Sequence, residues 1–134
     1  MSCELSAPLQ AAVFARLVAH GGLQDLVGGA IYDEIPPGTP PGTFVVLGPE
    51  EVVDRSDRTG GGAEHRLRIS VISAAPGFQA AKQAAGAITE ALEAAPLSLS
   101  RGRVVGLWFD RAVAAQKPAG ARRIDITYRA RVEP

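Results

Sequence analysis

The alternation of apolar and polar residues is clearest in residues 64–73. One side of this segment is apolar and consists of Leu67, Ile69 and Val71. The other side is polar and consists of Arg66, Arg68 and Ser70. A period of two residues is the pattern of a strand with one buried face. We therefore predict a half-buried strand here, around which the rest of the chain is organised.

The same patterns predict further strands on both sides of this segment. In chain order they are residues 30–33, 43–48, 50–57, 104–115 and 122–132. Pro49 is expected to end the second of them, because proline cannot donate a ladder hydrogen bond. The last two strands flank a turn that contains Pro118 and Gly120. We predict that these two strands pair as a long hairpin.

Two amphipathic helices are predicted from apolar residues that recur every three or four positions. The first covers Pro8–Ala19, with Ser6 as its N-cap and Gly21 and Gly22 at its end. Leu23–Val27 would add one further short helical turn. The second helix covers Pro76–Ala95. Its predicted buried stripe consists of Ala81, Ala85, Ile88 and Leu92.

The order of these elements predicts an α+β fold. We expect a two-layer sandwich, in which a mainly antiparallel β-sheet packs against two main helices. A length of 134 residues with 46% apolar residues suits a single domain over residues 1–134. Large side chains are few, and they are the expected anchors of the core. These anchors are Phe14, Tyr32, Phe44, Trp108, Phe109 and Tyr128.

The other face of the sheet is predicted to be polar and basic. Its arginines are Arg66, Arg68, Arg123, Arg129 and Arg131. Such a face is either solvated or forms an assembly interface or channel wall, and the sequence leaves these alternatives open. The charged segment before Gly60-Gly61-Gly62 reads as a hairpin tip. A strand rather than a helix follows these glycines and no lysine is nearby, which argues against a phosphate-binding loop.

Charge and residue chemistry exclude several classes of function. The 14 basic and 14 acidic residues cancel, so a general attraction to nucleic acid is not expected. Cys3 is the only cysteine, and His20 and His65 have no partners at metal-ligand spacing. We expect no catalytic residues, metal or cofactor, and therefore no enzyme. With no long apolar run or signal peptide, we expect a protein that is soluble and cytoplasmic when synthesised.

Several blocks of the sequence resemble a family of small phage-like tail proteins. The blocks are residues 9–13, 27–29, 31–38, 44–48 and 64–67. The most specific are Tyr-Asp-Glu-Ile-Pro-Pro-Gly at 32–38 and Glu-His-Arg-Leu at 64–67. The family includes the tail terminator of gene transfer agents, which are phage-derived particles that carry host DNA. The resemblance extends over nearly the whole chain.

The resemblance implies a structural role in a particle. A tail terminator forms a hexameric ring that caps the tail tube, ends its polymerisation and joins it to the head-side connector. DNA passes through the lumen, and the protein resides at the head–tail junction. A neighbouring neck role, as a head–tail stopper or connector, is the first alternative. An alternative of another class is a small-molecule-binding α+β domain with a pocket near Trp108.

Our hypothesis for the contacts combines the hairpin tip and the arginine-bearing strands. The interface residues it names are Asp57, Arg58, Thr59, Arg66, Arg68, Arg123, Arg129 and Arg131. An exposed strand edge can pair with a neighbouring chain, and a ring needs a heterologous interface whose rotation closes. The expected partners are further copies of this chain, the tail-tube protein and the connector, with no membrane.

Overall fold

A computed structural model describes residues 3–35, 37–38, 40–55, 61–118 and 120–134 of the chain. In chain order its elements are α1 (Ser6–Ala19), α2 (Gly21–Val27), β1 (Ile31–Tyr32), β2 (Thr43–Asp54), β3 (Ala63–Ser73), α3 (Gln79–Glu93), β4 (Arg103–Gln116) and β5 (Arg122–Glu133).

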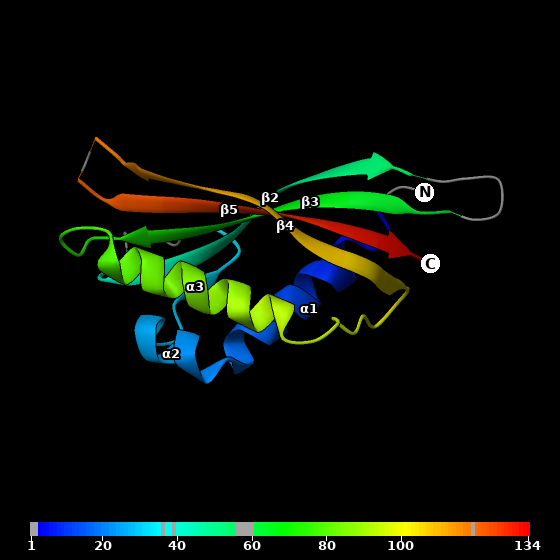
Figure 1. The fold of residues 1–134 in the computed structure, drawn as a ribbon, viewed down its shortest axis with the longest axis horizontal. Coiled ribbons are helices and arrows are strands. Elements are labelled where there is room, and N and C mark those ends of the chain that lie inside the picture. The colour runs from blue at the N-terminus through cyan, green and yellow to red at the C-terminus, as the bar shows by residue number, and fades with distance from the viewer. Residues whose placement is uncertain (1–2, 36, 39, 56–60, 119) are drawn as a thin grey trace.

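The structure has two layers, a twisted open sheet and a layer of helices on one of its faces (Figure 1). The strand order is β1-β2-β3-β5-β4. β1 runs parallel to β2, and every other neighbouring pair is antiparallel. This arrangement confirms the predicted α+β fold with a mainly antiparallel sheet. It also confirms the hairpin of the last two strands, which are β4 and β5.

The core lies between the helices and the inner face of the sheet. β5 contributes alternate residues that are all buried: Ile124, Ile126, Tyr128, Ala130 and Val132. α1 buries Leu9, Val13 and Leu17, which follow each other at four-residue spacing. α3 buries Ala81, Ala84, Ile88, Ala91 and Leu92, so its stripe is close to the predicted one. Small alanines on this stripe allow α3 to lie close to the sheet.

A smaller apolar contact lies on the outer face of the sheet. Phe44 on β2 pairs in register with Ile72 on β3, and both are buried. They alternate with the core-facing residues Val45 and Val71 and therefore point away from the helices. The ring of Tyr32 meets Phe44 edge to face with centroids 6.2 Å apart. One end of the sheet is therefore covered on both faces.

The prediction that Pro49 ends a strand is wrong. β2 continues from Thr43 to Asp54, and its pairing with β3 shifts register between Leu47 and Glu50. The Gly48–Pro49 peptide bond is cis. The short β1 pairs only with Val45 and Val46, so Pro49 lies in a bulge beyond β1, where its missing N–H group leaves no ladder bond unmade.

The helix ends also differ from the predicted ones. α1 begins at Ser6 itself, with Leu5 as its N-cap, so Ser6 does not act as the cap. His20 ends α1, and its Nδ1 accepts a hydrogen bond from the Leu23 N–H at 3.0 Å, which caps α2. α3 is shorter than predicted, because Pro76 and Gly77 form an entry turn in which Gly77 has a φ of 71°.

Arg16 of α1 forms hydrogen bonds with the end of α3. Its Nη1 donates to the carbonyl oxygens of Ala91 at 3.0 Å and Ala95 at 2.8 Å. Its Nη2 donates to the carbonyl oxygen of Pro96 at 3.1 Å. The last carbonyl groups of a helix have no partners within the helix, and a cation there complements the helix dipole. One guanidinium group therefore completes α3 and fixes its position against α1.

We expect Arg16→Ala to lower the free energy of unfolding by roughly 1.5–3 kcal/mol, the range for hydrogen bonds to a charged group. Urea unfolding followed by circular dichroism would measure this change. Gln10→Ala is the matched control, because Gln10 is an exposed residue of the same helix. Equal stability of the two variants would contradict the role assigned to Arg16.

Candidate functional site

The arginines predicted from the sequence lie together on the outer face of the sheet. Arg66 and Arg68 come from β3, and Arg123, Arg129 and Arg131 come from the neighbouring β5. Arg66 is the direct cross-strand partner of Arg129. The other three predicted interface residues, Asp57, Arg58 and Thr59, lie outside the described residues.

Acidic side chains separate these arginines. The carboxylate of Glu64 lies 3.1 Å from Arg66, 3.6 Å from Arg129 and 3.9 Å from Arg55. Arg66 also approaches Glu51 at 3.5 Å, and Arg129 approaches Asp110 at 3.7 Å. Two arginines that face each other across strands would repel, and the shared carboxylate offsets this repulsion. The outer face is therefore charged but largely compensated.

A second polar group lies further along the same two strands. Asp125 accepts hydrogen bonds from the Ser70 hydroxyl at 2.6 Å and from the Arg123 Nε at 2.8 Å. Arg123 also donates to the Ser70 hydroxyl at 3.2 Å. Burial opposes ionisation of Asp125, but these hydrogen bonds and the charges of Arg123 and Arg68 outweigh it and lower the pKa of the carboxyl group.

The edge strand β4 is open to solvent. Every residue from Trp108 to its end at Gln116 is exposed, including Phe109 at 45% and Val113 at 50%. Trp108 and Phe109 were predicted as core anchors, and this prediction is wrong, because β4 has β5 on one side only. The distal half of β4 thus leaves one backbone edge and much of both faces unpartnered within the described residues.

The Trp108 ring lies along the outer face of β4 rather than in the core. A Cβ atom on Gly106 would come within 2.4 Å of the ring, so the indole packs directly over this glycine. The Arg129 guanidinium lies 5.9 Å from the ring centroid, which is cation–π distance. Trp108 therefore forms part of a surface together with the arginines of β5.

The opposite edge of the molecule also carries exposed apolar residues. They form a stripe on α1, on the side away from its buried residues, and are Ala7, Ala11, Phe14 and Val18. Phe14 is 41% exposed, so its prediction as a core anchor is also wrong. Ala7, Ala11 and Phe14 border an open groove of about 690 Å³, whose other wall includes Tyr32 and Asp33 of the β1 region.

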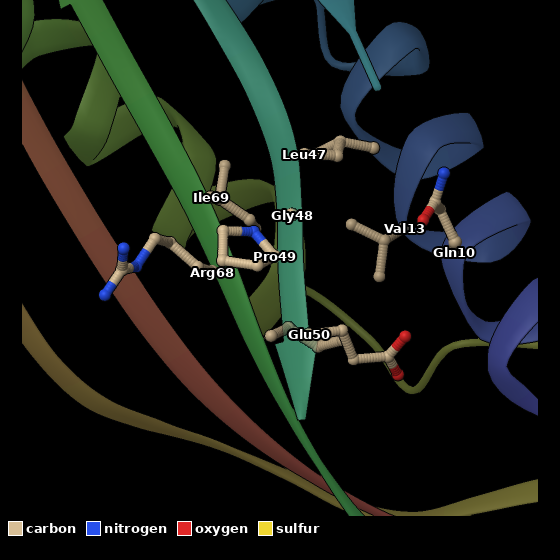
Figure 2. A pocket seen from close by; sticks show the side chains of 9 residues that line it. Gln10, Val13, Leu47, Gly48, Pro49, Glu50, Arg68 and Ile69 are labelled. Carbon is tan, nitrogen blue, oxygen red and sulfur yellow. The ribbon is translucent and has the colours of Figure 1, made fainter. Parts of the chain in front are cut away.

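Neither the polar side chains nor the small cavity near this groove forms a reactive site. Figure 2 shows the Glu50 side chain on the α1 side of β2 and Arg68 on the opposite side. Glu50 accepts a hydrogen bond from Nδ1 of His65, which is fully buried. The hollow drawn there has a volume of about 20 Å³, little more than a water molecule needs. Within the described ranges, no three histidine, cysteine or acidic residues gather as metal ligands would.

Comparison with known proteins agrees with a structural rather than a chemical role for these surfaces. The family model described as tail completion protein gp17 matches residues 11–133. The chain belongs to the tail completion protein gp17 family. A comparison with curated proteins found no match.

A solved structure supports the same family. It is the virion of a native gene transfer agent (GTA) particle, and one of its chains is 54% identical to this tail completion protein. The match covers 99% of this chain and 100% of that one, with a TM-score of 0.92. The protein is therefore a phage-like tail structural protein. In the helices that the structure describes, none is long and apolar enough to cross a membrane.

The sequence analysis missed two features of this tail completion protein. The first is the exposed stripe on α1, which its spacing of four, three and four residues could have revealed as a second apolar face. The second is the open edge of the sheet, which the sequence analysis assigned to no particular strand. β5 lies between β3 and β4, so its backbone is already paired on both sides, and the free edge belongs to β4.

We expect Asp125→Asn to destabilise the protein at pH 7 and to have little effect in acid. The lowered pKa of Asp125 adds stability above the unfolded-state pKa of about 3.9, and this stability is lost as pH falls through the folded-state pKa. Thermal unfolding of wild type and variant at pH 7, 5 and 3 would measure the difference. Glu34→Gln is the control, because Glu34 is exposed. A melting difference independent of pH would contradict this role.

Proposed function

We propose that this protein is the tail terminator of a phage-like particle. Copies form a hexameric ring that caps the tail tube, ends its polymerisation and joins it to the head-side connector at the head–tail junction. The observation that carries the proposal is the open strand β4, which is 14 residues long and exposes Trp108, Phe109 and Val113. An apolar edge of this length is a place where another chain adds to the sheet.

The compensated outer face supports passage of DNA through the ring. Three of its five arginines, Arg66, Arg123 and Arg129, are held in ion pairs with Glu64, Glu51, Asp110 and Asp125. Each phosphate contact by a free basic side chain strengthens binding to DNA. A lumen in which most arginines are paired attracts the DNA backbone weakly, which lets DNA move past without being held.

The proposed ring needs no catalysis and no cofactor. The family and the similar virion chain are structural components, which points away from an enzyme. The groove beside α1 is open and bordered by exposed alanines and Phe14, as expected of a contact surface between proteins. A head–tail stopper would use similar surfaces, and the position of the protein in electron micrographs of particles separates these two roles.

We expect the purified protein to form hexamers on its own or after addition of the tail-tube protein. Many assembly proteins associate only when they meet their partner, so both conditions are needed. Mass photometry would measure the oligomer, and negative-stain micrographs would show caps on tube ends. Tubes that continue to lengthen in the presence of the protein would contradict tail termination.

We further expect deletion of residues 58–61 to give a folded monomer that no longer assembles. The segment lies in the sequence between β2 and β3, and β2 ends and β3 begins at the end of the sheet away from the ends of β4 and β5 that join (Figure 1). Its charged residue is Arg58, which is suited to a protein contact. Circular dichroism and mass photometry would report folding and assembly. A control deletion of Pro118 and Ala119 shortens the opposite turn instead. Unchanged rings in the first variant would refute this contact.

A further inference from the structure

We infer that neighbouring copies in the proposed ring meet head to tail, with β4 of one copy packed against the α1–β1 edge of the next. This inference depends on the proposed ring and names its two contact surfaces. We call them the β4 edge, which consists of residues 101–118 and 120–123, and the α1–β1 edge, which consists of α1 and residues 25–35.

Charge is distributed unevenly between the two sides of the sheet. Residues 17–54 hold six acidic residues and no lysine or arginine: Asp25, Asp33, Glu34, Glu50, Glu51 and Asp54. Residues 101–123 hold six basic residues: Arg101, Arg103, Arg111, Lys117, Arg122 and Arg123. Asp110 is the only acidic residue of that second segment. The net charge of zero for the chain therefore conceals an acidic region and a basic region.

The strand order places these regions at opposite edges. β1 and β2 form one side of the sheet, and β4 forms the other, with β3 and β5 between them. Two copies related by a two-fold axis would bring identical edges together, acidic on acidic or basic on basic, which electrostatic repulsion disfavours. A head-to-tail arrangement brings unlike edges together. Such a heterologous contact repeats around a ring if its rotation closes.

The apolar surfaces of the two edges also suit each other. The exposed stripe of α1 presents Phe14 and Val18 between small alanines. On β4 the exposed residues Ala112 and Ala114 pair with Ile126 and Ile124 of β5, so they lie on the helix side of the sheet. Two alanines leave room for a helix to approach this strand closely. The α1 stripe of the next copy would extend the helix layer beneath β4.

Some charged groups at these edges are available for a partner. Asp33 and Glu34 are exposed, as are Arg111 and Lys117 on the other edge. Within the described part of the chain, none of these four forms an ion pair. Their substitution would therefore leave the ion pairs of the outer face intact. They are the residues with which to test the contact between copies.

The test uses two variants, each of which reverses two exposed charges on one edge. Variant A carries Asp33→Arg and Glu34→Arg, and variant B carries Arg111→Glu and Lys117→Glu. At these four positions each variant alone brings charges of like sign together, so we expect loss of the ring and a monomeric mass, with or without tail-tube protein. Mixed together, A and B again bring charges of unlike sign together at these positions. We expect the mixture to recover a ring with equal numbers of A and B, measured by native mass spectrometry.

Controls separate this contact from general charge effects and from the proposed function itself. Lys82→Glu reverses an exposed charge on α3 that forms no ion pair within the described residues, and we expect it to assemble as wild type does. If A and B each assemble alone, or if their mixture does not assemble while wild type does, the inference is wrong and the ring stands. If wild type forms no ring under either condition, the proposed function itself is wrong.

The neutral variant Asp33→Asn with Glu34→Gln covers the case in which a reversed variant does not fold. We expect it to fold and to need a higher protein concentration than wild type for assembly. We also expect its assembly to depend less on salt than that of wild type, because screening has fewer charges to act on. Assembly with the concentration and salt dependence of wild type would overturn the inference.

Discussion

The pairing of β3 on both sides is the constraint on which the rest of the structure depends. β3 pairs with β2 on one side and along its whole length with β5 on the other. A slip of one residue would turn Ile69 and Val71 out of the core and turn Arg66 and Arg68 into it. The register is therefore fixed by the cost of burying those charges, and it decides which residues form each face of the sheet.

The fixed register explains why the outer face is compensated rather than strongly basic. It places Arg66 opposite Arg129, and Glu64, one residue before Arg66 in the chain, supplies the carboxylate that both guanidinium groups approach. Ser70, Asp125 and Arg123 are brought together in the same way. A strand order that separated β3 from β5 would remove the contact of Arg129 with Glu64 and those of Ser70 with Asp125 and Arg123. The pairing of β3 with β5 therefore determines both which residues form the core and how the charges of the proposed lumen are arranged.

The strand order leaves the sheet with two open edges. Bulges in β4 and β2 limit which other strands can pair with these edges. β4 contains register shifts at Val104/Gly106 and Phe109/Arg111, and β2 contains one at Leu47/Glu50. Bulges twist an edge and make it a poor template for indiscriminate strand addition. A partner must then match the shape of the edge as well as its charge. This combination suits a protein that assembles with defined neighbours in a particle and not with any exposed strand.

The sequence by itself determined the fold class, the long hairpin, the buried stripes of α1 and α3, and the arginines of the outer face, because each depends on local periodicity or chain order. Only the tertiary structure decided that Phe14, Trp108 and Phe109 are exposed and that Pro49 is accommodated within β2. A large apolar side chain has the same local pattern in a core strand and in an edge strand. Whether water reaches it depends on which strands flank it, and residues far apart in the chain decide that.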